Sequence, residues 1–241
     1  MRLEDSLIPV NSLVHAQGWL TQADERTWFT HRAPQLPAGA KAGIEVLEGV
    51  PAGANGTIVH GELDARWERE GLVVTSWQEK PPKPDPITES VVQLTKQLSA
   101  QRRPKERVLS PAAQQAREEL IQSLFGEGKV ISRTVLTVRP GEKVTVVAAQ
   151  DRNEVEHLLG SYFESGYLLV VTASWTAEDV SAVSNALAGL PEGLVISVGQ
   201  GINARGENPV RAQLFVANNE FETIQQQSPP GLLLGDVWFQ Q

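Results

Sequence analysis

The chain has 241 residues, of which 41% are hydrophobic and 21% are charged, a composition typical of globular proteins with one large or two ordinary domains. It contains no cysteine, which excludes disulfides, thiolate nucleophiles and zinc or iron–sulfur sites held by cysteine. The first residues lack the apolar core of a signal peptide, and no run of about 18 apolar residues occurs. We therefore expect a cytoplasmic protein with no membrane partner.

The formal net charge of −8 is spread unevenly along the sequence. Residues 1–80 carry 7 basic and 11 acidic residues, residues 81–110 carry 6 and 3, and residues 111–241 carry 8 and 15. A basic middle segment thus separates two acidic regions. Because the chain as a whole lacks the positive excess of a basic nucleic-acid-binding domain, any binding of phosphate is expected to be local.

The first region is rich in β-branched and aromatic residues, in short segments separated by turn-formers. These segments predict five strands, at 12–22, 26–32, 42–49, 56–67 and 71–78. Gly18 and Gly61 lie inside two of them, where glycine often marks a bulge or a tight barrel bend. The strand number, the spacing and the internal glycines resemble an OB-type barrel, and they also fit an SH3-like barrel.

A proline-rich segment, EKPPKPDP at 79–86, disfavours both helix and sheet and predicts a domain boundary. We expect a β-rich, OB-like domain at 1–80 and an α/β domain at 111–241. Between them, residues 81–110 predict the proline-rich linker, a short helix and an exposed basic turn, QRRPKER.

The last region alternates between helical and strand patterns. Ser110, Asp151 and Thr176 are N-cap residue types and predict three helix starts. Strands are expected in a hairpin at 131–149 and at 167–174, 193–199, 210–218 and 231–240, and the apolar segment at 193–199 is expected to be buried. The predicted fold class is α+β or α/β, with a small barrel followed by an α/β layer and a mixed sheet.

Aromatic residues of the first region are the main candidates for a binding surface. On a strand, Trp28 and Phe29 point to opposite faces, so one enters the core and the other tends toward the surface. An aromatic ring flanked by cations is typical of single-stranded nucleic-acid platforms, where bases stack on the ring and arginine neutralises phosphate. The alternative is that Trp28 and Trp67 are barrel core and rim, which the acidic neighbours Glu68 and Glu70 favour.

The basic turn could add phosphate contacts or dock on an acidic partner. The candidate nucleic-acid-binding residues are Arg26, Trp28, Phe29, His31, Arg32, Arg66, Trp67, Arg69, Arg102, Arg103, Lys105 and Arg107.

A glycine-rich segment, GQGINARGENP, follows the strand expected at 193–199. A dinucleotide-binding turn needs a helix after its glycines, and Gly206 and Pro209 would break one here. We therefore expect a loop that could contact phosphate or a partner. Its candidate residues are Asn203, Arg205 and Arg211.

Catalytic and metal-binding patterns are weak. His60, Glu62 and Asp64 alternate on one strand and could approach a metal, but a solvated strand face explains them more simply. Neither a G-x-S-x-G elbow nor a Walker A pattern occurs. We expect no metal, no cofactor and no catalytic residue.

The sequence therefore favours a non-enzymatic protein that binds nucleic acid, in particular single-stranded DNA, through the OB-like barrel. The first alternative is a protein–protein adaptor or homo-oligomeric assembly component, whose apolar tail SPPGLLLGDVWFQQ could pair with a neighbour's sheet edge. The second alternative is an enzyme with its site at strand ends of the C-terminal domain, near Asn203 and Arg205.

Overall fold

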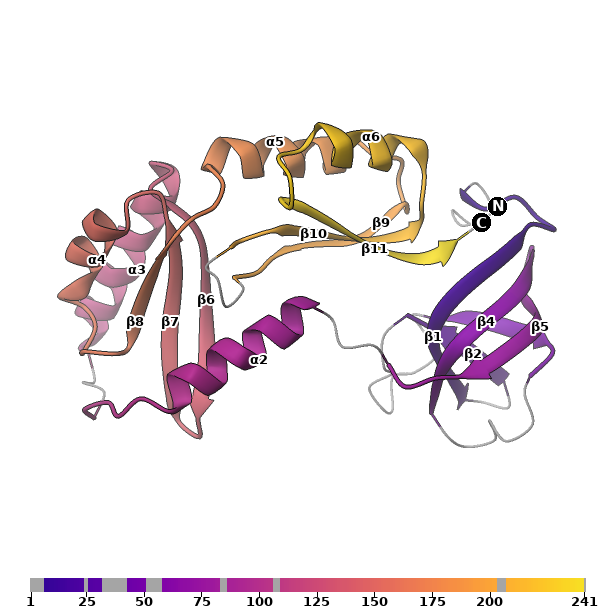
Figure 1. The fold of residues 1–241 in the computed structure, drawn as a ribbon, viewed down its shortest axis with the longest axis horizontal. Helices are drawn as coiled ribbons and strands as arrows, with labels where there is room; N and C mark the ends of the chain where they lie inside the picture. The colour runs from indigo at the N-terminus through magenta and orange to yellow at the C-terminus, as the bar shows by residue number, and fades with distance from the viewer. Residues whose placement is uncertain are drawn as a thin grey trace.

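The computed structural model describes residues 7–23, 26–31, 43–50, 58–82, 86–105, 109–202 and 207–240. Figure 1 shows a β-barrel at one end, a sheet flanked by helices at the other, and a layer of strands between them. Within the described residues, no helix combines the length and the apolar character needed to cross a membrane. In chain order the elements are β1 (Leu13–Ala23), β2 (Arg26–Thr30), β3 (Ile44–Glu48), β4 (Val59–Glu68), β5 (Gly71–Glu79), α2 (Pro86–Ser99), α3 (Pro111–Gly126), β6 (Val130–Arg139), β7 (Glu142–Ala149), α4 (Arg152–Gly160), β8 (Leu168–Thr172), α5 (Ala177–Ala188), β9 (Val195–Gln200), β10 (Val210–Val216), α6 (Asn219–Gln227) and β11 (Leu233–Gln240).

Strands β1 to β5 form a closed, mixed barrel, and the five strands lie where the sequence predicts them. Strand β1 pairs with both β2 and β4, and β3 pairs antiparallel with β2 and parallel with β5. The antiparallel β4–β5 pair completes the ring. The β3–β5 pair is parallel, whereas the other four pairings of the ring are antiparallel.

The two internal glycines allow aromatic rings to approach the strands inside the barrel. Gly18 and Gly61 are direct partners in the β1–β4 register, which runs without interruption past them. A Cβ at Gly18 would lie 2.7 Å from the ring of Phe29, and a Cβ at Gly61 would lie 2.6 Å from the ring of Trp77. Close packing, and not a bulge in this pairing, is therefore the reason for glycine at both positions.

The C-terminal strand β11 extends the barrel sheet. It pairs antiparallel with β1, with Ala16 opposite Phe239, and parallel with β10, which in turn pairs with β9. Phe239 is fully buried and Trp238 is nearly so, both within the barrel core. The apolar tail therefore pairs within its own chain, and one eight-stranded sheet spans both sequence regions. The division into two domains stays a prediction.

A second sheet, β6-β7-β8, is covered on both faces. Leu94 and Leu98 of α2 pack on one face, and α3 and α4 pack on the other through residues such as Ile121 and Leu159. The predicted N-caps are confirmed, because the side chains of Ser110, Asp151 and Thr176 each accept a hydrogen bond from a backbone N–H of the first helical turn.

Two expectations for the C-terminal region are wrong. Strand β9 is an edge strand, and Ile196 and Val198 are 45% and 47% exposed, so the segment 193–199 does not form a buried strand. The other error is that no helix was predicted between β10 and β11. Helix α6 lies there, crosses from β10 to the parallel strand β11 and is capped by Asn218. Its glutamine-rich sequence has few apolar residues to reveal it.

Candidate nucleic-acid interface

The outer face of β1 and β2 carries two tryptophans. Phe29 and Gly18 point into the barrel, so by alternation Trp28 and Trp19 point outward. Trp28 is paired with Thr21 and Trp19 with Thr30, which makes the two indoles diagonal neighbours on one surface. Both tryptophans are half-buried. Both residues therefore keep some accessible surface, although Nε1 of Trp28 is buried.

Trp19 is one of the aromatic residues of the first region, but it is not among the predicted binding residues. On its other side its ring meets the ring of His60 edge-on, with 4.9 Å between centroids. The alternation of β1 was the available signal, but its use required the β1–β2 register, which the periodicity of one strand does not give.

Arg26 extends this surface along β2, two residues before Trp28. Its side chain is 61% exposed and its Nη1 lies 3.1 Å from Oε2 of Glu45 on β3. Such exposed ion pairs contribute only about 0–1 kcal/mol, so the guanidinium can exchange its carboxylate for a phosphate at low cost. We call the surface formed by Trp19, Arg26, Trp28 and His60 the tryptophan face.

Phe29 and Trp67 do not belong to any binding surface. Phe29 is fully buried and Trp67 is 3% exposed. Their rings pack against β11, with centroid distances of 5.9 Å from Phe29 to Trp238 and 5.6 Å from Trp67 to Phe239. The expectation that these two residues offer stacking surfaces is thus corrected, because they build the barrel core.

Two further candidates lie where β4 turns into β5. Arg66 is exposed and its Nε donates to Oε1 of Glu68 at 2.6 Å. Arg69 is exposed in the turn, next to Glu70. Both cations face solvent, and each has an acidic neighbour in the sequence.

His31 lies at the junction between the barrel and β11. Its Nε2 is 3.3 Å from Oδ2 of Asp236, and the same oxygen lies 2.8 Å from Nη2 of Arg211. The hydrogen bond with His31 and then the interaction with Arg211 hold the pKa of Asp236 well below its ordinary value of 3.8, although partial burial opposes them. His31 and Arg211, expected in two separate sites, thus share one carboxylate.

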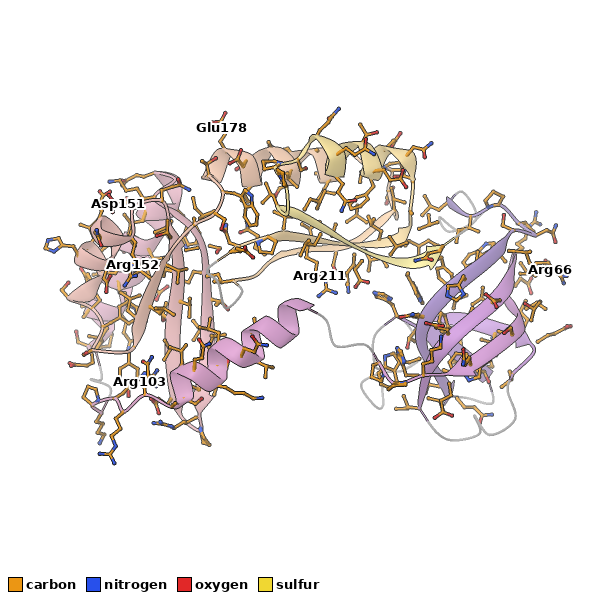
Figure 2. All side chains as sticks on the ribbon, in the orientation of Figure 1. Arg66, Arg103, Asp151, Arg152, Glu178 and Arg211 are labelled. Atoms are coloured by element: carbon orange, nitrogen blue, oxygen red, sulfur yellow. The ribbon has the colours of Figure 1, made fainter. Side chains whose placement is uncertain are left out.

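The basic turn is anchored to the second sheet, far from the barrel. The side chain of Arg103 is 1% exposed, and it donates to the carbonyl of Gly166 at 2.6 Å and to Glu142 at 3.1 Å. Arg102 and Lys105 beside it are exposed. Figure 2 places Arg103 and Arg66 at opposite ends of the molecule. The barrel and the basic turn therefore do not form a common surface.

Several predicted residues cannot be placed. Arg32, Arg107, Asn203 and Arg205 lie outside the described residues. The first two belong to the nucleic-acid candidates, and the last two also carried the enzyme alternative.

The three alternating residues of β4 are held by different partners. Asp64 lies 2.8 Å from Nδ1 of His15, Glu62 accepts from Gln17 and Lys80, and Nδ1 of His60 lies 2.7 Å from the carbonyl of Lys80. Within the described residues, no group of three or more histidine and acidic side chains is arranged to hold a metal ion. These side chains form a polar ladder across β1, β4 and the end of β5.

The geometry brings two of the predicted residues, Arg26 and Trp28, together with Trp19 and His60 on the tryptophan face. No protein-family model matches the chain, and a search of curated proteins finds no relative.

Proposed function

We propose that this chain is a non-enzymatic protein that binds single-stranded nucleic acid on the tryptophan face of its barrel. The observation that carries the proposal is the strand order β1-β2-β3-β5-β4, which the β1–β4 pair closes into a ring and which contains the parallel β3–β5 pair. A barrel built only from consecutive antiparallel hairpins lacks such a pair, so the order supports the OB-type alternative. OB-type barrels bind oligonucleotides on the face of their second and third strands and on the loops between strands 1 and 2 and strands 4 and 5.

The chemistry of the tryptophan face suits a flexible strand with exposed bases. Each base can stack on an indole, a contact worth about 1–3 kcal/mol that does not depend on base identity. Arg26 supplies a cation beside Trp28. Arg66 and Arg69 lie at the other end of the β1–β4 pair from Trp19, where they can hold the nucleic acid as it continues beyond the tryptophan face. With about three phosphates neutralised, log K is expected to fall with log salt with a slope of about −2. The acidic chain should therefore bind weakly and only at low salt.

The test is fluorescence anisotropy of a labelled oligothymidylate at low salt. Trp28→Ala should weaken binding by about 5- to 150-fold, which corresponds to one stacked base, and Trp28→Phe should retain most of it. For the charge contribution, Arg26→Glu should weaken binding. Its matched control is Arg152→Glu on α4, a 54% exposed arginine that is also paired with a glutamate. Absence of binding by the wild type at low salt rejects the proposal.

A second candidate function, assembly with another protein, is supported by strand β9. Its outer edge has no neighbour among the described strands, and Ile196 and Val198 are exposed on it. An unpaired, apolar edge is a template for a strand of another chain. Because the chain lacks cysteine, a photo-activated cross-linker can be attached at Val198→Cys alone. Cross-linking to any protein there, and not from Val135→Cys on β6, would support assembly; no cross-link from either site would reject it.

A further inference from the structure

From Ser197 onward, the edge of β9 lacks the charges and prolines that usually protect a sheet edge against pairing. The strand, VISVGQ, contains no charged residue and no proline. A register shift opposite Gln213 and Leu214 sets Ile196 out of the regular ladder, so the regular edge begins at Ser197. Beyond it, Val198 is 47% exposed, and a Cβ on Gly199 would meet nothing within 4 Å. Natural sheet edges are ordinarily blocked by charges, prolines or covering segments, and this part of β9 has none of these among the described residues.

The edges of the second sheet differ from β9. On β6, Val135 is also 47% exposed, but the strand carries Arg133, which is hydrogen-bonded to Glu118 of α3, and it ends in Arg139. On β8, Thr172 is polar and the apolar residues are at least partly covered. An incoming strand would therefore meet charges at β6 and covered side chains at β8.

Helix α5 lies on the sheet that contains β9. It packs on the sheet through Val183 and Leu187, in the cluster that also includes Val195 of β9. After its acidic first turn, its exposed residues are small or neutral: Ser181, Ala182, Asn185, Ala186 and Ala188. Small side chains allow a second helix to approach closely.

The charge of the C-terminal region bears on which partner can pair with β9. Residues 111–241 carry 8 basic and 15 acidic residues, so this region as a whole repels a second copy. Strand β9 and the part of α5 after its acidic first turn carry no charged residue, and in a two-fold arrangement this surface meets only itself. We propose that two copies of the chain pair antiparallel through β9, with their α5 helices side by side across the two-fold axis. This inference rests on the second candidate function and names its partner.

The size of the surface sets the expected affinity. The regular edge runs from Ser197 to Gln200, and four residues at about 3.3 Å each span about 13 Å. Such a short strand pair with one helix flank lies at the low end of interface sizes. We therefore expect a dimer that dissociates in the micromolar range. Its sheet would run continuously through both copies.

Sedimentation velocity of the purified full chain at concentrations from about 1 to 200 μM tests the pairing, because a dimer of micromolar affinity passes from monomer to dimer across that range. Val198→Lys should remain monomeric throughout, because it places a charge on each side of the two-fold axis. Val135→Lys is the matched control, with the same substitution at the same exposed fraction, and should dimerise as the wild type does.

Folding of each variant is checked by its thermal transition, which should match the wild type because both valines are largely exposed. A wild type that stays monomeric overturns the inference, as does a Val198→Lys variant that still dimerises. Neither result decides whether β9 binds a different protein, because the photo-cross-linking experiment tests that separately. Increased hydrogen-exchange protection of residues 195–200 at high wild-type concentration provides a second supporting measurement.

Discussion

Nε2 of His31, at the end of β2, lies 3.3 Å from Oδ2 of Asp236 in β11, and these residues are 205 positions apart in the sequence. Arg211 of β10 holds the same oxygen, and the ring of His31 lies 5.6 Å from that of Trp238. The barrel is thereby joined to the C-terminal strands by a polar contact beside an aromatic core. Asp236, the charged residue of β11, is the centre of this junction.

Replacing Asp236 by asparagine should destabilise the fold. The change removes the anion that His31 and Arg211 share, and we expect a loss of about 1–3 kcal/mol in the free energy of unfolding, measured by urea denaturation at pH 7. Asp64→Asn is the matched control, because Asp64 also pairs with a histidine, His15, but is 58% exposed. Its effect should stay within about 0.5 kcal/mol. Equal effects of the two substitutions would contradict a structural role for the junction.

The contribution of Asp236 should depend on pH. Its pKa is lowered in the folded state, chiefly by His31, so the unfolded state takes up the proton first as the pH falls. The stabilisation is therefore fully present above the ordinary pKa of 3.8 and is lost as the pH falls further, through the lower pKa of the folded state. Urea denaturation of the wild type and Asp236→Asn at pH 7, 5 and 3 should give similar differences at pH 7 and 5, and a smaller one at pH 3. If the difference in unfolding free energy between the wild type and Asp236→Asn grew as the pH fell, the prediction would be contradicted.

Local patterns predicted the elements, whereas long-range pairing decided the site. The strands of the barrel and the caps at Ser110 and Thr176 follow from alternation and side-chain chemistry within a few residues. The position of Trp19 beside Trp28 depends on the β1–β2 register, and the burial of Trp67 depends on β11, almost at the other end of the chain. Single-strand periodicity carries no information on either pairing.

The sequence also does not show whether a strand lies in the middle of a sheet or at its edge. An apolar run such as β9 is typical of a buried strand, yet its exposure depends on whether another strand lies beside it. Arg103 shows the reverse case, since a basic run is ordinarily solvated but this side chain is enclosed by β7 and the segment before β8.

Gly18 should not tolerate a side chain. A Cβ there would lie 2.5 Å from the carbonyl oxygen of Thr30 and 2.7 Å from the ring of Phe29, so Gly18→Ala must displace backbone or a fully buried ring. We expect a destabilisation of about 1–3 kcal/mol, read as a lower thermal midpoint. Gly160→Ala at the end of α4 is the control, because nothing lies within 4 Å of its added Cβ. The control should be neutral or slightly stabilising. An unchanged midpoint for Gly18→Ala would mean that the barrel accommodates the methyl group.

Arg103 and Arg102 are neighbours with opposite environments, which makes them a direct test of the basic turn. Arg103→Ala removes a buried guanidinium that donates to Glu142 and to the carbonyl of Gly166, while Glu142 keeps Arg139 as a second partner. We expect a loss of about 2–4 kcal/mol in urea denaturation, slightly below the usual cost of breaking a buried pair because of that second partner. Arg102→Ala, at an exposed position, should change stability by less than about 0.5 kcal/mol.

Both variants, where folded, should bind oligonucleotide as the wild type does, because the basic turn lies far from the tryptophan face. A selective loss of binding in Arg102→Ala would instead assign the basic turn to the nucleic-acid interface.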